Sequence, residues 1–272
     1  MGFDPYALDQ VRRSRLLLDQ LDEWIFHLIE PYLGARILEV GCGHGNMIHH
    51  LTDRELVVGV DIDQPSVDRV NANYKTLGNI RAYLCDVTSP RFLELTHHRF
   101  DTVVSVNVLE HIEDDELALQ NIGDILSVGG RLLLVLPAHN LLFGTMDKAI
   151  GHYRRYALET LPPKLSQAGF TPRIQQYINP LGALGWFVNG RLLRRKVPPS
   201  VQLKMFNQLM PLVLRLQERL RPSFGLSLVC VSEKSGRTPA NSTNASKRDV
   251  RDLMSQLHSG FEEPPAAKAS GS

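Results

Sequence analysis

The feature that most constrains the fold of this chain is a glycine-rich loop between a buried strand and a helix. The loop reads E-V-G-C-G-H-G-N over residues 39–46. An apolar strand at 36–40 leads into it, and a segment that can start a helix, 46–51, follows. Glycine permits tight turns and lets a ligand approach the backbone closely. This succession predicts the first unit of an α/β sheet with a ligand at the carboxyl edge.

The rest of the chain continues the alternation of strands and helices. Helices are expected at 65–74, 113–126 and 158–168. Seven strands are expected, at residues 36–40, 56–60, 80–84, 100–106, 131–136, 173–178 and 225–232. The alternation predicts an α/β, doubly wound, Rossmann-like fold. Its sheet is expected to be mostly parallel, with an antiparallel last strand and helices on both faces.

Composition divides the chain into four parts. Residues 1–33 are predicted to form an N-terminal helical segment, and the α/β domain comprises 34–178 plus 223–234. Residues 179–222 form a helical insert before the last strand. Residues 235–272 are rich in Ser, Pro, Ala, Asn and Lys, which predicts a disordered tail.

Charge and cysteine content exclude several function classes. The chain has 30 Lys and Arg against 29 Asp and Glu, and this balance argues against a dedicated nucleic-acid binder. Cys42, Cys85 and Cys230 show no C-x-x-C spacing and no His cluster completes a ligand set, so neither a disulfide framework nor a metal site is expected. Charged residues near the start exclude a signal-peptide core, and a cytoplasmic location is expected.

Three acidic residues indicate what the loop holds. Glu39 precedes the glycines, where a carboxylate would repel a phosphate and favour a cation. Asp61 ends the second strand, in the place from which a carboxylate accepts hydrogen bonds from ribose hydroxyls. Asp86 ends the third strand, where an adenine rim could meet it. The ligand predicted from these positions is an adenosine with a positive centre and no pyrophosphate, as in S-adenosylmethionine, and not NAD.

Residues 37–170 resemble the class I S-adenosylmethionine-dependent methyltransferases of the small-molecule type. The glycine loop matches the first motif of that family. Further motifs follow in the family's order: V-G-V-D-I-D at 58–63, C-D-V at 85–87, the strand at 100–106 with L-E-H-I at 109–112, and G-G-R-L-L at 129–133. The resemblance covers about half of the chain and is specific for fold and cofactor, not for substrate.

The resemblance implies which residues bind the cofactor. Asp61 would bind the ribose hydroxyls, and Asp86 would bind the adenine amino group. Glu39 would also contact the cofactor. The loop glycines Gly41, Gly43 and Gly45 would lie along its methionine and ribose. Ile62 and Val87 would lie beside the adenine, and the backbone of Asn107 would face the methionyl end. Two other acids receive structural interpretations: Asp63 as a helix cap and Asp101 as a turn residue.

The acceptor is expected near the long loop at 137–156, which follows the fifth strand and mixes aromatic, His and Arg side chains. His152 or Tyr153 is predicted to lie near the acceptor atom, and His139 is a second candidate for the base. The Arg pair has two open interpretations: binding an anionic acceptor group bidentately, or bonding Asp147 and helix ends to hold the loop. The predicted substrate-binding residues are Phe143, Arg154 and Arg155.

The sequence therefore predicts a methyltransferase that acts on a small-molecule acceptor by in-line displacement, with O-methylation favoured over N- or C-methylation. Two alternatives stay open: methylation of a lipid or lipid-linked glycan at a membrane surface, and a non-catalytic cofactor-binding regulator. The insert at 179–222 bears on the membrane alternative. Helices are expected in it at 181–195 and 201–220, and 191–221 carries eight Lys and Arg against Glu218. A lid, a homodimer interface, a membrane patch and a plain cap remain open for it.

Overall fold

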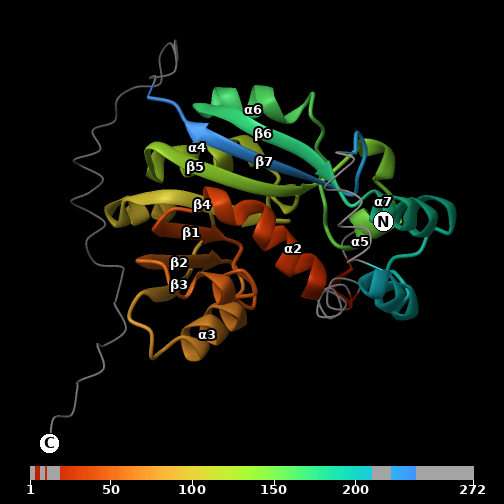
Figure 1. The fold of residues 1–272 in the computed structure, drawn as a ribbon, viewed down its shortest axis with the longest axis horizontal. Coiled ribbons are helices and arrows are strands. Elements are labelled where there is room, and N and C mark those ends of the chain that lie inside the picture. Colours follow the sequence, from red (N-terminus) through yellow and green to blue (C-terminus); the bar gives the residue numbers. More distant parts are fainter. Residues whose placement is uncertain (1–3, 7–9, 11–18, 210–221, 237–272) are drawn as a thin grey trace, which may run out of the picture. The chain divides into compact units, whose positions relative to one another are not determined.

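The computed structural model describes residues 4–6, 10, 19–209 and 222–236. Their strands form one seven-stranded sheet in the order β3-β2-β1-β4-β5-β7-β6 (Figure 1). The strands are β1 Arg36–Val40, β2 Leu56–Asp61, β3 Ile80–Leu84, β4 Phe100–Val106, β5 Leu126–Pro137, β6 Phe170–Ile178 and β7 Ser227–Lys234. Neighbouring strands from β3 to β5 pair in parallel, and β7 pairs antiparallel with both β5 and β6. The predicted fold class is confirmed.

Helices connect these strands and cover the sheet. The α-helices are α2 Asp19–Ile29, α3 Gln64–Asn73, α4 Asp115–Ile125, α5 Thr145–Ala149, α6 Leu161–Gln167 and α7 Pro180–Phe187. The shorter turns are η1 Glu30–Tyr32, η2 Ile48–Leu51, η3 Pro90–His98, η4 Leu109–His111, η5 Asn140–Leu142 and the π-helical η6 Val188–Leu192. Residues 200–209 are also helical.

The central strands β1, β2 and β4 are largely buried on both faces because most of their residues are apolar, whereas the edge strand β6 is only partly buried. Successive side chains of a strand point to opposite faces, so Leu38 and Val40 enter one core cluster and Ile37 enters the other. Residues of η3, α4 and α6 pack on the first face, and residues of α2, η2 and α3 pack on the second. The helix α2, in front of the sheet in Figure 1, gives the predicted N-terminal helical segment its place against the core.

Several elements differ from their predicted bounds by a few residues: β6 begins at Phe170 and not at 173, and β7 spans Ser227–Lys234 and not 225–232. Two further differences have a local cause. The strand β5 begins at Leu126 and runs through Gly129 and Gly130, which the sequence interpretation treated as a helix stop. Gly129 has φ +76°, and the register of the β4–β5 pairing shifts across the glycine pair, from Phe100 opposite Leu126 to Thr102 opposite Arg131, so the glycines form an irregularity inside the strand. The helix predicted at 181–195 is α7 followed by η6, whose buried Asn189 donates to the carbonyl of Gly185.

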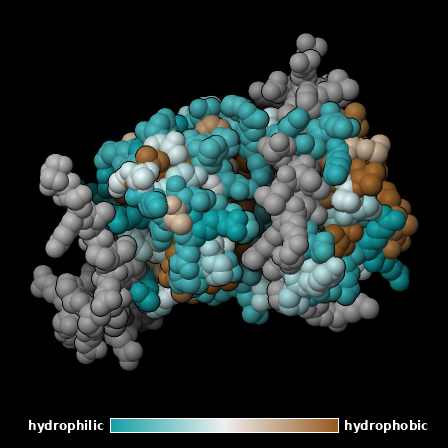
Figure 2. All heavy atoms as spheres, turned by 90° about the horizontal axis from the view of Figure 1, so that it is seen from below, coloured by the Kyte–Doolittle hydropathy of each residue, from teal (hydrophilic) through white to brown (hydrophobic). Residues whose placement is uncertain are grey.

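Parts of the predicted organisation fall beyond the described ranges. The helix expected at 201–220 is confirmed over 201–209, and the residues from 210 to 220 lie outside the described residues. The predicted tail lies outside them from residue 237 onward, as does most of the N-terminal segment before residue 19. Among the described residues, no helix combines the length and apolar content needed to cross a membrane. Figure 2 shows brown, hydrophobic side chains gathered at the side where α7 lies.

Candidate active site

The glycine loop after β1 makes an open cradle at the carboxyl edge of the sheet. Gly41, Gly43 and Gly45 all have positive φ, at 76°, 48° and 83°. A Cβ on Gly41 would lie 2.2 Å from the side chain of Val108, so no larger residue fits there. A Cβ on Gly43 would meet nothing within 4 Å. The loop therefore packs against the segment after β4 at Gly41, and at Gly43 its backbone is accessible to a ligand.

Asp61, at the end of β2, holds this loop in shape. Its two carboxylate oxygens accept hydrogen bonds from the backbone N–H of Gly43 at 2.8 Å and of Asp63 at 3.0 Å. Each carboxylate oxygen has a second lone pair, so Asp61 can accept hydroxyl groups of a ligand as well. The next residue, Ile62, is 76% exposed and offers an apolar surface beside the same cradle.

Glu39 is the most unusual group of the cradle. Its side chain is buried, with the residue only 4% exposed, and its Oε2 has no hydrogen-bond partner within the described part of the chain. Burial, together with the nearby charge of Asp61, holds the pKa of Glu39 well above its ordinary value. A cationic ligand group next to this carboxylate would give the unpartnered oxygen a partner and would offset the negative charge of Asp61. The orphaned oxygen and the open side of Gly43 therefore fit a nucleoside with a positive centre.

The other predicted cofactor residues occupy the same edge of the sheet with different surroundings. Asp86 is exposed, and its Oδ1 accepts the backbone N–H and the hydroxyl of Thr88 at 2.8 Å each. Val87 is buried in the core, where its carbonyl accepts from Asn121 at 2.8 Å, so its side chain packs inside the protein. Asn107 follows β4 with φ +54°, and its N–H donates to Val135 at 2.8 Å.

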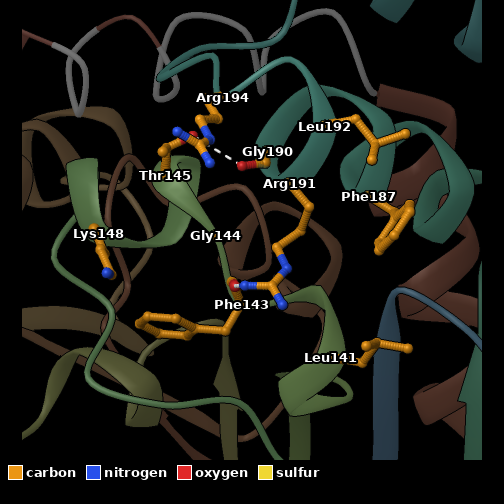
Figure 3. A pocket seen from close by; sticks show the side chains of 10 residues that line it. All are labelled: Leu141, Phe143, Gly144, Thr145, Lys148, Phe187, Gly190, Arg191, Leu192 and Arg194. Atoms are coloured by element: carbon orange, nitrogen blue, oxygen red, sulfur yellow. Dashed lines mark hydrogen bonds between the residues drawn. The ribbon is translucent and has the colours of Figure 1, made fainter.

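Phe143 lines a cavity of about 570 Å³ between the loop after β5 and η6 (Figure 3). Its carbonyl accepts a hydrogen bond from Nη1 of Arg191 at 3.2 Å. The hydroxyl of Thr145, at the start of α5, lies 3.0 Å from the carbonyl oxygen of Gly190 and 2.5 Å from that of Arg195, so its one proton is donated to either carbonyl. These bonds seat the insert on α5.

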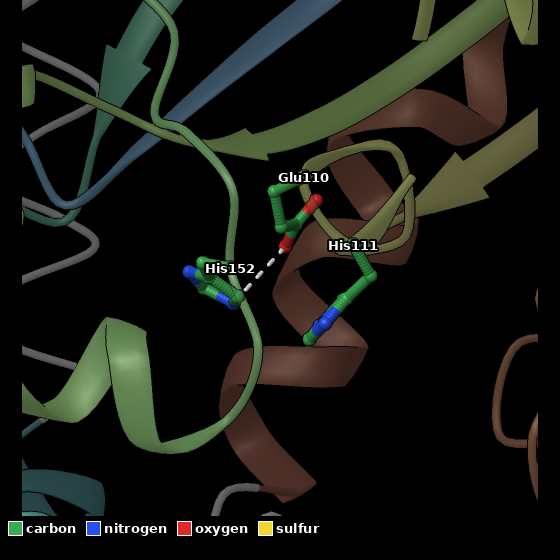
Figure 4. A group of neighbouring side chains, drawn as sticks. All are labelled: Glu110, His111 and His152. Atoms are coloured by element: carbon green, nitrogen blue, oxygen red, sulfur yellow. Dashed lines mark ion pairs between the residues drawn. The ribbon is translucent and has the colours of Figure 1, made fainter. Parts of the chain in front are cut away.

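A cluster of titratable side chains lies where η4 meets the segment after α5 (Figure 4). Nε2 of His152 is 3.7 Å from Oε1 of Glu110, and both side chains are nearly inaccessible to solvent. The rings of His111 and His152 meet edge to face, with centroids 4.6 Å apart. Glu110 comes two residues after Val108, which contacts Gly41, so the cluster adjoins the glycine loop.

Asp147, on α5, organises this cluster. Its Oδ1 accepts from Nδ1 of His152 at 3.0 Å and from Nε of Arg155 at 2.7 Å. Its Oδ2 accepts from the N–H of Gly144 at 2.9 Å and from Nε1 of Trp186 at 3.0 Å. Burial alone would raise the pKa of Asp147, but the His152 hydrogen bond and the Arg155 charge outweigh it and hold the pKa below its ordinary value.

The tautomer of His152 follows from this arrangement. An ionised carboxylate only accepts hydrogen bonds, so the Nδ1 that faces Asp147 carries the proton. The Nε2 that faces Glu110 is then the nitrogen available to accept a proton. His152 is therefore oriented as a base by a carboxylate behind it, the arrangement used in acid–base catalysis.

Both arginines of the predicted pair bond groups within the protein. Arg155 is buried and also donates to the carbonyl of Ala138 at 3.0 Å. Arg154 contacts Asp115 at 2.5 Å and donates to the carbonyl of Glu113 at 2.6 Å. These contacts match the interpretation in which the pair bonds Asp147 and neighbouring acids to hold the loop.

The two remaining catalytic candidates lie differently. Tyr153 is exposed, and its N–H donates to the carbonyl of Glu110 at 2.8 Å, next to the cluster. His139 stacks between Tyr177 and Phe224, with ring centroids 4.1 and 4.3 Å away. Burial lowers the pKa of His139. The structure thus brings Tyr153 to the cluster and places His139 in a separate aromatic group.

One set of described residues has the composition of a metal site: Glu110, His111 and His152, whose ligand atoms lie within 4.8 Å of one another. Of the three, Glu110 is buried, and His152 is also held by Asp147 through its Nδ1.

Sequence reasoning missed Glu110 and Asp147 as partners of His152. Glu110 appeared only inside the L-E-H-I motif, and Asp147 only as a partner of the arginines. No periodic pattern marks a carboxylate five residues before a histidine in a loop. The second acid lies 42 positions from His152 (152 − 110) and reaches it through the fold.

Comparisons with known proteins agree with this geometry. Residues 38–134 match the family model described as a methyltransferase domain. An uncharacterized methyltransferase of Mycobacterium tuberculosis is 37% identical over 100 residues, which are 36% of this chain and 49% of that protein. A ubiquinone biosynthesis O-methyltransferase of Chelativorans sp. is 25% identical over 163 residues, 60% of this chain and 62% of that protein. The first of these matches spans about half the length of the relative.

A solved structure shows the same fold. The N-methyltransferase NodS of Bradyrhizobium japonicum, in complex with S-adenosyl-L-homocysteine, superposes with a TM-score of 0.52 at 15% identity, covering 80% of this chain and 87% of that chain. The cradle with its orphaned carboxylate fits the cofactor that such proteins bind. Residues 38–134 thus form a methyltransferase domain, and the S-adenosylmethionine-dependent methyltransferase expected from the sequence is supported by these relatives.

Proposed function

We propose that this protein transfers a methyl group from S-adenosylmethionine to a hydroxyl oxygen of a small-molecule acceptor, by in-line displacement. The observation that carries the proposal is the Asp147–His152 pair, which presents a proton-accepting nitrogen beside the glycine loop. A hydroxyl must lose its proton on methylation, whereas carboxylates and free amines need no strong base. The similarity to a ubiquinone biosynthesis O-methyltransferase supports oxygen as the acceptor atom.

The cofactor side of the proposal assigns roles to the residues of the cradle. Bound S-adenosylmethionine supplies a methyl group on a positively charged sulfur, which is already a strong electrophile. Glu39 would compensate positive charge, Asp61 would accept the ribose hydroxyls, and Ile62 would cover the adenine. The protein then contributes mainly alignment, which is worth about 7–11 kcal/mol of the barrier.

His152 would remove the acceptor proton. Its imidazolium would lie between Asp147 and Glu110, and the negative charge of Asp147 would stabilise the proton once it has been taken up. General-base catalysis of this kind contributes roughly 10²–10⁴-fold in rate. Asp147 acts through His152 and is a positioning residue.

The test is transfer of a tritiated methyl group from the cofactor to fractions of a cell extract, followed by two variants on the identified acceptor. Asp61→Ala is expected to weaken cofactor binding by about 1–3 kcal/mol, because the ribose hydroxyls and the N–H groups of the loop lose their acceptor. His152→Ala is expected to lower turnover while calorimetric affinity for the cofactor stays unchanged. The exposed His97→Ala is the matched control. Full turnover of His152→Ala would refute the proposed base.

A second candidate function is methylation of a lipid or lipid-linked glycan, and a specific observation favours it. The insert exposes many apolar side chains among basic ones, as described below. If the cofactor binds but no fraction receives the methyl group, a regulator that binds S-adenosylmethionine without transferring its methyl would be the better reading.

A further inference from the structure

We propose that a face formed by residues 181–209 docks on an anionic lipid bilayer. This docking face comprises α7, η6 and the helix at 200–209, and Leu141 of the loop after β5 continues it across the cavity. The proposal concerns membrane contact, which can be measured without an acceptor and does not depend on methyl transfer.

The docking face exposes an unusual amount of apolar surface. Leu184, Leu192 and Val201 are 60%, 64% and 69% exposed. Their exposed apolar neighbours on the face are Leu141, Leu181, Leu193, Met205 and Leu209. Figure 2 shows hydrophobic side chains gathered on this side of the molecule. Contiguous exposed apolar residues of this kind mark an interaction surface, since single ones are scattered on ordinary surfaces.

The positive charge of the same segment favours a negatively charged partner. Between residues 179 and 209 the sequence contains no Asp or Glu, and it contains five basic residues: Arg191, Arg194, Arg195, Lys196 and Lys204. All five are exposed. One of them, Lys196, forms an ion pair with Asp4 at 2.7 Å, so the other four set the positive potential of the face. Basic side chains interleaved with Leu and Met fit an anionic lipid interface, where cations meet headgroups and apolar side chains enter the acyl boundary.

A second copy of this chain is a poorer occupant of the face. A twofold dimer places the same patch of both copies in contact. Apart from Lys196, which pairs with Asp4, the basic residues of the two patches would then face each other with no acidic residue of 179–209 between them, and like charges repel. A bilayer supplies the missing negative charge and a place for the leucines.

The cavity at the edge of the face has the same mixed lining. Figure 3 shows the cationic ends of Lys148, Arg191 and Arg194 on one part of its wall and the apolar side chains of Leu192 and Phe187 on another. An anionic headgroup with an attached hydrocarbon chain matches both parts. The docking face and its cavity therefore both fit an anionic amphiphile.

The docking face is also connected to the acceptor side of the active site. Trp186 of α7 donates from Nε1 to Oδ2 of Asp147 at 3.0 Å, and the other oxygen of that carboxylate holds His152. Arg155 lies over the Trp186 ring, 5.1 Å from its centroid. A membrane in contact with α7 would therefore lie near the residues that handle the acceptor.

The experiment is co-sedimentation of the full chain with sucrose-loaded vesicles, either of pure phosphatidylcholine or of phosphatidylcholine mixed with phosphatidylserine, over a salt series. Binding is expected only to the mixed vesicles and should weaken with salt. Arg194→Glu with Lys204→Glu should lower binding at least tenfold, because each cation near the surface is worth about fivefold. Lys75→Glu with Arg81→Glu, two exposed residues outside the face, is the matched charge control.

A second pair of variants tests the apolar part. Leu192→Asn with Val201→Asn should weaken binding to mixed vesicles even at low salt, while cofactor binding by calorimetry shows that the protein remains folded. The proposal is overturned if the intact protein does not sediment with mixed vesicles, or if the face and control variants bind equally. It is also overturned if sedimentation velocity shows a dimer that only the face variants dissociate.

Discussion

At the scale of single residues, Asp147 determines the chemistry of its neighbours. Its carboxylate accepts four hydrogen bonds, from a loop N–H, an imidazole, a guanidinium and an indole. Those donors come from three segments of the chain, so one buried charge joins the loop after β5, the segment that carries His152, and α7. Removing the charge should affect both folding and proton transfer.

We expect Asp147→Asn to lower the free energy of unfolding by about 3–5 kcal/mol at neutral pH, because the buried guanidinium of Arg155 loses its partner. The lowered pKa of Asp147 gives the sign of the pH dependence. Its contribution is full above the ordinary carboxyl pKa and is lost as the pH falls through the lowered value. The difference between wild type and variant should therefore shrink in acid. Urea unfolding at several pH values measures it, with the exposed Asp53→Asn as control.

Glu39 leads to a prediction about cofactor binding. Burial and the charge of Asp61 raise the pKa of Glu39 and so favour its protonated form, whereas a cationic ligand favours the carboxylate. Affinity for S-adenosylmethionine should therefore rise as the pH rises through this pKa, and binding should release protons. Calorimetry in two buffers of different ionisation enthalpy counts the protons. Glu39→Gln should bind more weakly and should lose this release; an unchanged proton count would show that another group titrates.

At the scale of elements, the cradle depends on how α3 begins. Asp63 is the N-cap of α3, and its carboxylate accepts from the N–H and the hydroxyl of Ser66 at 3.0 and 2.6 Å. This confirms the interpretation of Asp63 as a cap. The same residue donates its N–H to Asp61, so the start of α3 and the carboxylate proposed to bind the ribose are joined.

We expect Asp63→Ala to destabilise the protein by about 0.5–2 kcal/mol, the usual cost of losing an N-cap. The N–H of residue 63 remains, so Asp61 keeps its hydrogen bond and cofactor affinity should change little. Thermal unfolding and calorimetry separate the two effects. A large loss of affinity with unchanged stability would assign Asp63 to the binding site.

The ends of elements show where local pattern is insufficient. The sequence interpretation began β5 at residue 131, after Gly129 and Gly130, because paired glycines usually end a helix. In the fold, α4 ends at Ile125 and Leu126 already pairs with Phe100 of β4, whereas the regular pairing with β4 and β7 begins at Arg131, after the glycines. The single tertiary pairing of Leu126 therefore extends the strand beyond the bound that the local pattern gives.

At the scale of the whole molecule, the cofactor should stabilise the fold. A ligand that binds only the folded state adds about 2.7 kcal/mol at a hundred times its Kd. We expect S-adenosylmethionine to raise Tm in a concentration-dependent manner, and Asp61→Ala to need more cofactor for the same shift. NAD serves as the control ligand. Stabilisation by NAD and not by S-adenosylmethionine would contradict the assignment of the cradle.

Much of the fold, and the edge of the sheet at which the predicted cofactor residues lie, could be predicted from the sequence. The glycine loop, Glu39, Asp61 and Asp86 belong to short segments at strand ends, where a parallel sheet places them at one edge whatever the details. The contacts of the predicted acceptor-side residues could not be predicted in this way. His152, His139 and the arginines share one loop and looked alike in sequence, yet only some of them reach the buried cluster.

The sequence alone therefore determined the α/β class, the order of strands and the identity of the cradle, because these follow from periodicity and from backbone conformations that only glycine adopts readily. The tertiary structure decided which histidine meets a carboxylate, which arginine is buried, and which face of the insert stays exposed. Those outcomes depend on contacts between residues far apart in the chain. Such contacts are set by packing and by the need to pair every buried charge, and no local pattern encodes them.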